Sequence, residues 1–472
     1  MLPKTAHEPP VVFHWIPYVG SAHGDIFTFV LFGRNITCYL GVDGNEFILN
    51  GKLQDLNAEE IYGEVTTPVF GSDVVYDCPN SKFMEQKKFV KFGLTQKALE
   101  SHVQSIEMEV EDYIKSNFKG STGTIDMYNT MSQVTIFTAG RALQGKEVRS
   151  KLTNEFADLY HDLDNGFTPI NFLLPWAPLP RNRRRDAARN KMRKVYEKII
   201  QKRRQNGTPS SVEEESDMIS NLMQCTYKNG QPVPDKEIAH MMIVLLMAGQ
   251  HTSASASSWI LLRLASQPEI ADELLGEQVR VLQPQGPDRH LPPLQHSDLD
   301  KLPLLKNVIK ETLRMHSSFH SIMRKVKSPM PVAGTPYVIG TDKVLLASPT
   351  MTGLSEEYFP NAKRWDPYRW GMEENNSSSS TSTADVGEKM VDYGFGAVSL
   401  KGMKNPYLPF GAGRHRCIGE KFAYVNLGVI VATMVRYFQF QSLDGAQAPP
   451  PTDYTSMLSR PLQPVLVRWT RR

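Results

Sequence analysis

One cysteine of the sequence lies in a setting that is unusual for a thiol. Cys417 occurs in the stretch FGAGRHRCIGE, residues Phe410–Glu420, among three glycines and three basic residues. A nucleophilic thiolate would need an activating base, and His415, two residues away, points elsewhere in an extended loop. A structural thiol would be expected in apolar surroundings. Since glycines let the backbone approach both a sulfur and a flat ligand closely, we expect Cys417 to be the axial thiolate of a haem iron.

A second group of candidate residues lies about a hundred positions upstream. In KLPLLKNVIKETLRMHSS, Glu311 and Arg314 are three residues apart and share one face of a predicted helix with apolar side chains. The pair has two interpretations. It could be an exposed helical ion pair, worth only about 0.2–0.5 kcal/mol, or part of a buried charge network.

A third group lies in the middle of a long predicted helix, Glu237–Ala265, which keeps its apolar composition for about eight turns. It contains Ala248, Gly249, His251 and Thr252. A mid-helix glycine costs about 1 kcal/mol against alanine, so we expect a close neighbour there. Thr252 can hydrogen-bond to the carbonyl four residues earlier and open the helix locally. His251 is either a satisfied core histidine or a group that transfers protons.

Together these motifs carry a resemblance to a known superfamily. The cysteine stretch matches the F-x-x-G-x-x-x-C-x-G signature of the cytochromes P-450, the haem-thiolate monooxygenases, at Phe410, Gly413, Cys417 and Gly419. The resemblance adds Arg369, in RWDPYRW, as the third member of a Glu311–Arg314–Arg369 network.

Further stretches resemble one branch of this superfamily, the sterol 14α-demethylases. These are the A-G-x-H-T-S motif and YGEVTTPVFGSDVVYD, together with HSIMRKV and GFTPINFLLPWAPLP, which are similar to the fungal members. The resemblance extends from about Pro9 to the C-terminus.

The resemblance implies a role for each of several residues. The residues implied to bond the haem propionates are Tyr62, Tyr76, Lys87, Arg324 and His415. For Lys87 the alternative is a solvated lysine in the run EQKKFVKF. The residues implied to line a long apolar substrate pocket are Phe70, Tyr76, Ala248, Ser321, Met323 and Met457. Thr252 and His251 would relay protons for the activation of dioxygen.

The implied reaction is the removal of the 14α-methyl group of lanosterol or 24-methylenedihydrolanosterol in ergosterol biosynthesis. Three monooxygenations convert the methyl group into alcohol, aldehyde and then formate. The implied cofactor is haem b, with electrons from NADPH through a flavoprotein reductase, NADPH-cytochrome P-450 reductase, that docks on a basic face. Azoles would be inhibitors. The alternatives are a haem-thiolate protein that binds or senses without turnover and, more distantly, a thiol hydrolase.

Composition and patterning set the elements that must position these groups. The chain has 472 residues, a formal net charge of +3 and four widely spaced cysteines, which gives no indication of a disulfide framework, a zinc site or a nucleic-acid partner. Residues 25–50 and 330–347 read as strands, and residues 56–282 as largely helical. We expect a single α+β domain, mainly α-helical, with small β-sheets and a buried haem: the cytochrome P-450 fold.

Three segments call for separate interpretation. Residues 1–24 lack the membrane anchor and first helix that the resembled family carries, a family found on the cytoplasmic face of the endoplasmic reticulum membrane, so the membrane surface is an expected partner. Residues 371–404 read as a polar surface insertion within a haem domain of residues 25–472. Arg181–Arg204 has twelve Lys and Arg against two acids, and its recurring apolar positions favour a solvated helix face over a nucleic-acid arm.

Overall fold

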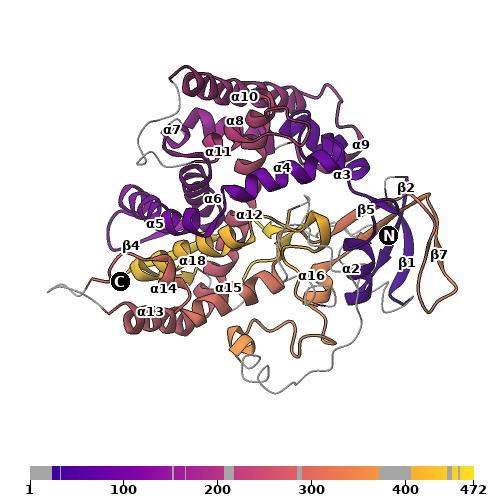
Figure 1. Ribbon diagram of the computed structural model, residues 1–472. Coiled ribbons are helices and arrows are strands. Elements are labelled where there is room, and N and C mark those ends of the chain that lie inside the picture. The colour runs from indigo at the N-terminus through magenta and orange to yellow at the C-terminus, as the bar shows by residue number, and fades with distance from the viewer. Residues whose placement is uncertain are drawn as a thin grey trace, which may run out of the picture.

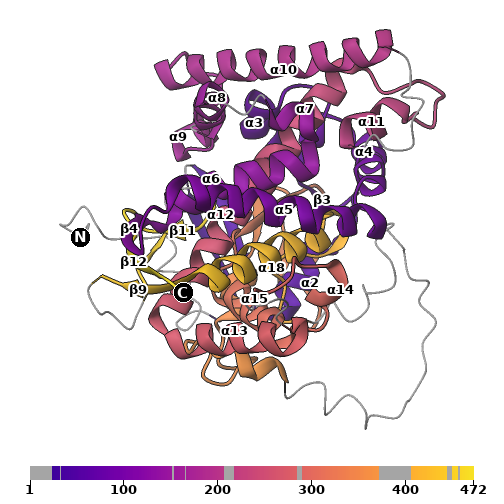
Figure 2. The same ribbon diagram turned by 90° about the vertical axis from the view of Figure 1, so that its left-hand side faces the viewer.

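The long apolar helix in the middle of the chain forms the axis of the fold. In the computed structural model this helix, α12 (Asp235–Ser266), is shared by two hydrophobic clusters. One cluster packs α12 against α5 (Gln96–Asn117), α6 (Met127–Ala139), α13 (Pro268–Leu282), α15 (Pro303–Met315) and α18 (Glu420–Tyr437). The other packs it against α3 (Glu59–Phe70), α4 (Asn80–Phe92), α8 (Asn154–Asp164), α10 (Pro180–Asn206) and α11 (Met218–Gln224). Figures 1 and 2 show α12 near the centre, with α10 above it and α13 and α15 below. Burial on nearly every side explains why α12 is apolar all round.

The structure describes residues 24–31, 33–150, 154–164, 166–206, 217–283, 290–371, 405–443, 449–454 and 458–472. The predicted segment 1–24 and the predicted insertion 371–404 therefore lie, apart from Gly24 and Gly371, outside the described residues, as does Met457.

The helices follow in chain order. They are α2 (Gly41–Leu49), α3 (Glu59–Phe70), α4 (Asn80–Phe92), α5 (Gln96–Asn117), α6 (Met127–Ala139), α7 (Lys146–Arg149), α8 (Asn154–Asp164), α9 (Pro169–Leu173), α10 (Pro180–Asn206), α11 (Met218–Gln224), α12, α13 (Pro268–Leu282), α14 (His296–Leu299), α15 (Pro303–Met315), α16 (Pro349–Gly353) and α18 (Glu420–Tyr437). Short 3₁₀ turns are η1 (Val75–Asp77), η3 (Pro367–Gly371) and η5 (Gly413–His415), and η2 (Gly140–Gln144) is a π-helical turn.

Within the described residues, four small sheets complete the fold. The largest has the order β1-β2-β8-β5-β3, in which β2 and β8 are parallel and the other pairs antiparallel. Its strands are β1 (Ile26–Leu31), β2 (Arg34–Tyr39), β3 (Leu56–Asn57), β5 (Ile322–Val326) and β8 (Lys343–Ala347). A three-stranded sheet joins β4 (Thr122–Asp126), β12 (Leu466–Arg471) and β9 (Phe438–Ser442), and two-stranded ladders pair β6 (Met330–Pro331) with β7 (Val338–Ile339) and β10 (Thr452–Asp453) with β11 (Arg460–Pro461). The predicted α+β class is confirmed.

Two of the segment predictions need correction. The second half of residues 25–50, read as strands, contains the helix α2. Its buried residues Gly44, Asn45, Ile48 and Leu49 recur at helical spacing, and this pattern outweighs the β-branched and aromatic residues on which the strand interpretation rested. Two strands, β3 and β4, also interrupt the region predicted as helical; each pairs with a strand that lies more than 250 residues away in sequence.

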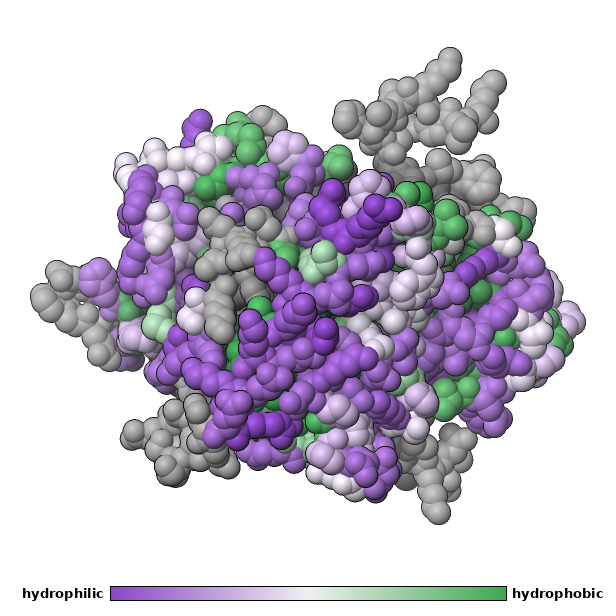
Figure 3. Space-filling view, turned by 90° about the horizontal axis from the view of Figure 1, so that it is seen from above, coloured by the Kyte–Doolittle hydropathy of each residue, from purple (hydrophilic) through white to green (hydrophobic). Residues whose placement is uncertain are grey.

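The basic segment Arg181–Arg204 is part of α10, as its apolar periodicity predicts. Four of its apolar residues are buried in the cluster that packs α12 against α3, α4, α8, α10 and α11: Met192, Tyr196, Ile199 and Ile200. Several of its arginines pair with acids of neighbouring helices and loops, for example Arg184 with Asp162. Seen from above, the molecule presents a mostly hydrophilic surface with scattered hydrophobic residues (Figure 3).

Candidate functional site

The cysteine loop is shaped by its glycines and by a backbone bond across it. Gly411 and Gly413 have φ of +67° and +65°, which side chains other than glycine rarely adopt. A Cβ at Gly413 would lie 2.2 Å from the carbonyl oxygen of Leu49, so that position excludes any larger residue. The Cys417 amide donates to the Phe410 carbonyl at 3.0 Å and closes the loop just before α18 begins.

The Cys417 sulfur is accessible to a ligand, although the loop encloses it deeply enough to affect its ionisation. Burial raises the pKa of the Cys417 thiol, while the Gly419 amide and the charges of Lys87 and Arg416 act in the opposite direction. The N–H of Gly419 therefore acts as a hydrogen-bond donor to the sulfur. A thiol held in this way ionises when a metal binds it.

Lys87 is buried and supports the loop from α4. Its Nζ donates to the carbonyls of Arg414 at 2.8 Å and Arg416 at 3.0 Å, on either side of the position of His415. Burial lowers the pKa of Lys87 to about 8, against the opposing influence of Cys417. The alternative of a solvated surface lysine is wrong.

The two arginines of the loop are already engaged within the protein. The guanidinium of Arg414 bonds to the carbonyls of Gly51 and Leu56, the latter at 2.7 Å, and Arg416 pairs with Glu420 at 2.6 Å. Arg414 is buried and therefore contributes no surface for a partner protein.

A cluster of donors for an anion lies beside this loop. The Tyr76 ring lies 5.2 Å from the Tyr62 ring and 5.9 Å from the His415 imidazole, and Arg324 from β5 is buried next to Tyr62. The Tyr62 oxygen accepts from the Met323 amide at 2.9 Å, which leaves its O–H free to donate. Among the described residues no carboxylate forms an ion pair with Arg324. The predicted residues therefore converge in space.

The charges of this cluster favour a bound carboxylate. Burial, together with Arg324, Arg414 and Lys87, lowers the pKa of His415 to about 2, and neither ring nitrogen has a partner within the described residues. Burial raises the pKa of Tyr76 to about 12 and that of Tyr62 above its ordinary value. All these groups are donors with few internal acceptors, so the propionates of a haem whose iron is bound by Cys417 fit the residues present.

The residues predicted to take part in oxygen activation lie on α12. The Thr252 hydroxyl donates to the Ala248 carbonyl at 2.8 Å, as predicted, but α12 is continuous from Asp235 to Ser266, so the predicted local opening of the helix is not seen. A Cβ at Gly249 would lie 3.1 Å from Leu143 of the π-helical turn η2. The close neighbour that the structure shows on this side of Gly249 is thus the Leu143 side chain.

His251 has a partner that the sequence did not indicate. Its Nε2 lies 2.8 Å from Oδ1 of Asp164, the last residue of α8, at ion-pair distance although not aligned as a hydrogen bond. Burial acts to raise the pKa of Asp164, but His251, Arg460 and His161 hold it below its ordinary value. A carboxylate 87 positions away carries no local signal in the sequence, because only the packing of α8 beside α12 brings the two together.

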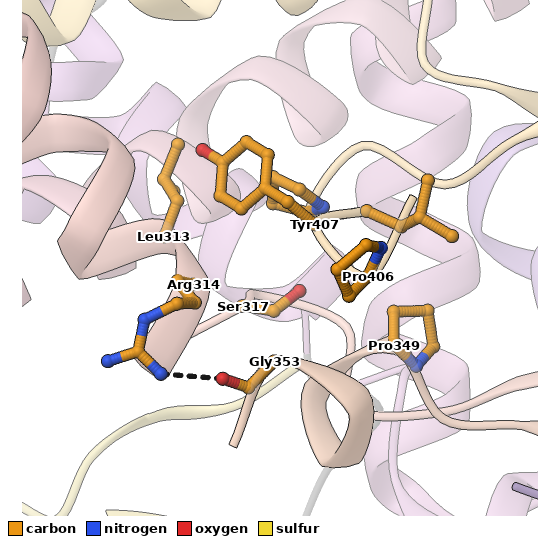
Figure 4. A pocket seen from close by; sticks show the side chains of 9 residues that line it. Leu313, Arg314, Ser317, Pro349, Gly353, Pro406 and Tyr407 are labelled. Carbon is orange, nitrogen blue, oxygen red and sulfur yellow. Dashed lines mark hydrogen bonds between the residues drawn. The ribbon is translucent and has the colours of Figure 1, made fainter. Parts of the chain in front are cut away.

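The charge network on α15 is buried and complete. Glu311, with no exposed surface, accepts from Arg314 Nε and NH2 at 2.9 and 2.8 Å, from Arg369 Nε at 2.9 Å, from the Trp370 indole at 3.2 Å and from the Asp366 amide at 3.0 Å. Arg314 also donates to the Gly353 carbonyl beside a small hollow that Tyr407 and Pro406 line (Figure 4). The network therefore ties α15 to η3 and to α16, and the exposed-pair interpretation is wrong.

The residues predicted for the substrate pocket are spread over four segments. Phe70, at the end of α3, has its ring 5.6 Å from that of Phe167, and Met323 packs with Tyr62 in one hydrophobic cluster. The Ser321 hydroxyl lies 3.1 Å from Nδ1 of His320, and Ala248 is exposed on α12. The structure brings Tyr76 and Met323 together with Tyr62, while Met457 lies outside the described residues.

The described residues form neither a metal-ion cluster nor a membrane-spanning helix. No three His, Cys, Asp or Glu side chains of the described residues are grouped so that they could hold a metal ion. In the same part of the chain no helix is both long and apolar enough to cross a membrane.

Comparison with known proteins identifies the family. The sequence model of the family "Cytochrome P450" matches residues 12–469. A sterol 14-alpha demethylase of Gibberella zeae is 64% identical, with 100% of this chain and 94% of that protein covered. An eburicol 14-alpha-demethylase of Penicillium italicum is 59% identical over 98% of this chain and 92% of its own length.

A solved structure agrees at the level of the fold. The retinoic-acid-bound cyanobacterial CYP120A1 superposes with a TM-score of 0.77 over 97% of this chain and 94% of its own, at 20% identity. Together with the cysteine loop, the donor cluster and the Glu311 network, these likenesses show that the chain is a cytochrome P450 and belongs to the sterol 14-alpha demethylases.

Proposed function

We propose that the protein removes the 14α-methyl group of a sterol, lanosterol or 24-methylenedihydrolanosterol, as a haem-thiolate monooxygenase. The observation that carries this proposal is the accessible Cys417 sulfur in a loop closed by its own backbone, next to the donor cluster of Tyr62, Tyr76, Arg324 and His415. Bound there, haem b supplies the oxidative chemistry, which the protein alone does not possess.

The protein's contribution to the cofactor is to hold it at both ends. Cys417 would bind the iron, and Phe410, Gly413 and Gly419 shape the loop that presents the sulfur. Tyr62, Tyr76, Arg324 and His415 would donate to the propionates. Lys87 is within reach of the same region, but its bonds to the Arg414 and Arg416 carbonyls support a second role, which is to fix the loop.

Proton delivery is assigned to His251 and Thr252, with Asp164 as the partner of the histidine. The Asp164 carboxylate lies 2.8 Å from Nε2, where it can orient the imidazole and exchange a proton with it, so His251 can relay a proton toward Thr252. The Thr252 hydroxyl, held by the Ala248 carbonyl, stands on the same helix one residue further. Each of the three oxidations consumes protons, and this path would serve all three.

The sterol would lie against Phe70, Tyr76, Ala248, Ser321, Met323 and Met457. A rigid, largely apolar tetracycle suits walls that offer few hydrogen bonds. Azoles would occupy the same space. Electrons would come from NADPH through a flavoprotein reductase, docked on the side of the cysteine loop.

A membrane surface as partner is supported by exposed apolar side chains around α9. Ile170, Leu174 and Trp176 are 38%, 57% and 64% exposed. An exposed tryptophan next to apolar neighbours is typical of contact with the interfacial region of a bilayer. From the resemblance to its family, we propose that this membrane is the endoplasmic reticulum and that the enzyme lies on its cytoplasmic face.

The proposal is tested in two steps with purified holoprotein. A reduced, carbon-monoxide difference spectrum shows whether the iron carries a thiolate. Incubation with a fungal reductase, NADPH and each of the two sterols, followed by mass spectrometry, should then give formate and a 14α-demethylated sterol in equal amounts. A thiolate spectrum without any sterol product would contradict the proposal and favour a haem-thiolate protein without turnover.

A further inference from the structure

The loop between α3 and α4 carries Tyr76 to the donor cluster and has an unusual backbone. Three of its residues have positive φ: Gly71 at +100°, Asp73 at +69° and Val75 at +54°. A β-branched residue such as valine is a true outlier there, because its side chain collides with its own backbone. Residues in such conformations persist only where the surroundings over-determine them, and they are found where a site requires them.

Gln86 of α4 holds the strained half of the loop. Its side-chain amide donates to the Asp73 carbonyl at 2.8 Å and to the Tyr227 hydroxyl at 3.0 Å, and its oxygen accepts from the Val75 amide at 3.4 Å. Gln86 is 3% exposed, so these bonds are shielded from water. Asp73 and Val75, the two residues of this loop that have positive φ and are not glycine, are therefore both held by the Gln86 side chain.

The far side of Gln86 is itself anchored to α12. The Tyr227 hydroxyl donates to Glu237 at 2.6 Å, and Lys82 pairs with the same carboxylate at 2.8 Å. Burial and the bond to Glu237 raise the pKa of Tyr227, so its hydroxyl keeps its proton and can donate. This chain of contacts links α4, the segment after α11 and the start of α12.

His240 of α12 holds the other half of the loop. Its Nδ1 is 2.8 Å from the Ser72 carbonyl, to which the ring N–H donates. The imidazole also lies against Gly71, where a Cβ would be 2.4 Å from ring atoms. His240 is 3% exposed and stands on the same helix as His251.

We propose that Gln86 and His240 are positioning residues that keep the Gly71–Asp77 loop in its strained conformation and so set where Phe70 and Tyr76 stand against the ligand. This inference rests on the proposed sterol function for the identity of the ligand. The role of Gln86 and His240 in holding the loop does not depend on that function. Phe70 ends α3 immediately before this loop, and the Tyr76 ring within it reaches Tyr62 and His415. Selectivity among sterols and azoles would then depend on residues that touch neither.

The test measures the loop and the pocket separately, in the holoenzyme. Gln86→Met keeps the volume of the side chain but removes its bonds. We expect faster amide hydrogen exchange in residues 71–78 and about tenfold weaker sterol binding by spectral titration, with a much smaller change in the rate at saturating sterol. His240→Phe keeps a ring against Gly71 without the donor and should act in the same direction.

Strain distinguishes this role from ordinary packing. Glycine adopts the φ of Val75 without collision, so Val75→Gly should remove the need for the clamp. In that background we expect Gln86→Met to weaken sterol binding by about twofold or less, and additive effects of the two substitutions would overturn the proposal. Gln278, 2% exposed and hydrogen-bonded far from the loop, gives the matched control Gln278→Met, which should leave both readouts unchanged.

The remaining outcomes are also decisive. Unchanged exchange in residues 71–78 of both variants would overturn the clamp. Faster amide hydrogen exchange with unchanged sterol and azole affinity would show that the loop is held but that it does not set the shape of the pocket, which would overturn that part of the proposal. If the wild-type protein binds no sterol, the proposed function fails, while the exchange data still decide whether Gln86 and His240 hold the loop.

Discussion

Replacement of Glu311 by alanine should strongly destabilise the protein where α15 is joined to η3 and α16. The substitution leaves the guanidinium groups of Arg314 and Arg369 without their shared carboxylate, and the Arg314 and Glu311 side chains have no exposed surface. Removal of one partner of a buried ion pair costs about 3–5 kcal/mol. The Trp370 indole and the Asp366 amide lose their acceptor as well. This is a large share of the roughly 5–15 kcal/mol that stabilises a typical domain.

The assay is equilibrium urea unfolding together with the yield of holoprotein. With an unfolding slope of roughly 4 kcal/mol per M urea, above the range of small proteins because the slope grows with chain size, the midpoint should fall by about 1 M. The control is Glu64→Ala, which removes an ion pair to Arg34 whose side chains are 42% and 57% exposed. That variant should lose less than about 1 kcal/mol. Equal midpoints for the two variants would refute a buried network.

Three further predictions concern the site and its surroundings. Cys417→Ala should abolish the thiolate signature of the haem spectrum, and its retention would exclude Cys417 as the ligand. His251→Ala should lower sterol turnover by about 10²–10⁴-fold and the product formed per NADPH consumed, with haem binding kept; Asp164→Asn should lower both in the same direction, and unchanged coupling in both variants would make the pair structural. Burial and the charge of Arg263 lower the pKa of His316 well below its ordinary value. Below about pH 6.5 the unfolded chain therefore binds a proton at His316 that the folded protein does not bind. The free energy of unfolding should then fall by up to about 1.4 kcal/mol per pH unit. Urea midpoints from pH 7 to 5.5 should thus fall less steeply for His316→Gln, and parallel profiles would contradict this.

The parts of the site that the sequence could predict are those with a local signature. The glycines around Cys417 mark a loop because positive φ requires them, and Thr252 bonds four residues back because the helix geometry dictates it. The Glu311–Arg314 spacing placed both groups on one helix face. The sequence alone could not show that this face is buried, and it required a resemblance to connect Arg369 to it.

What could not be predicted depends on packing between distant segments. Asp164 meets His251 only through the contact of α8 with α12, and Gln86 meets Val75 only because α4 folds back beside the loop. Lys87 stands in a charged run that resembles a surface, yet its ammonium reaches the cysteine loop. The strand interpretation of α2 failed for the opposite reason: aromatic and β-branched residues suggested a local preference that burial on one helix face overrode.

The parallel pairing of β2 with β8 has a consequence for synthesis of the chain. Asn35 of β2 donates to Asp342 beside β8, 307 residues further on. At about 5–20 residues per second, the β1–β2 hairpin therefore leaves the ribosome about 15–60 s before its neighbouring strand exists. During that time the edge that includes Ile36 and Cys38, both buried in the finished protein, is open to other strands. The N-terminal hairpin is thus a segment of the nascent chain that would benefit from protection by a chaperone.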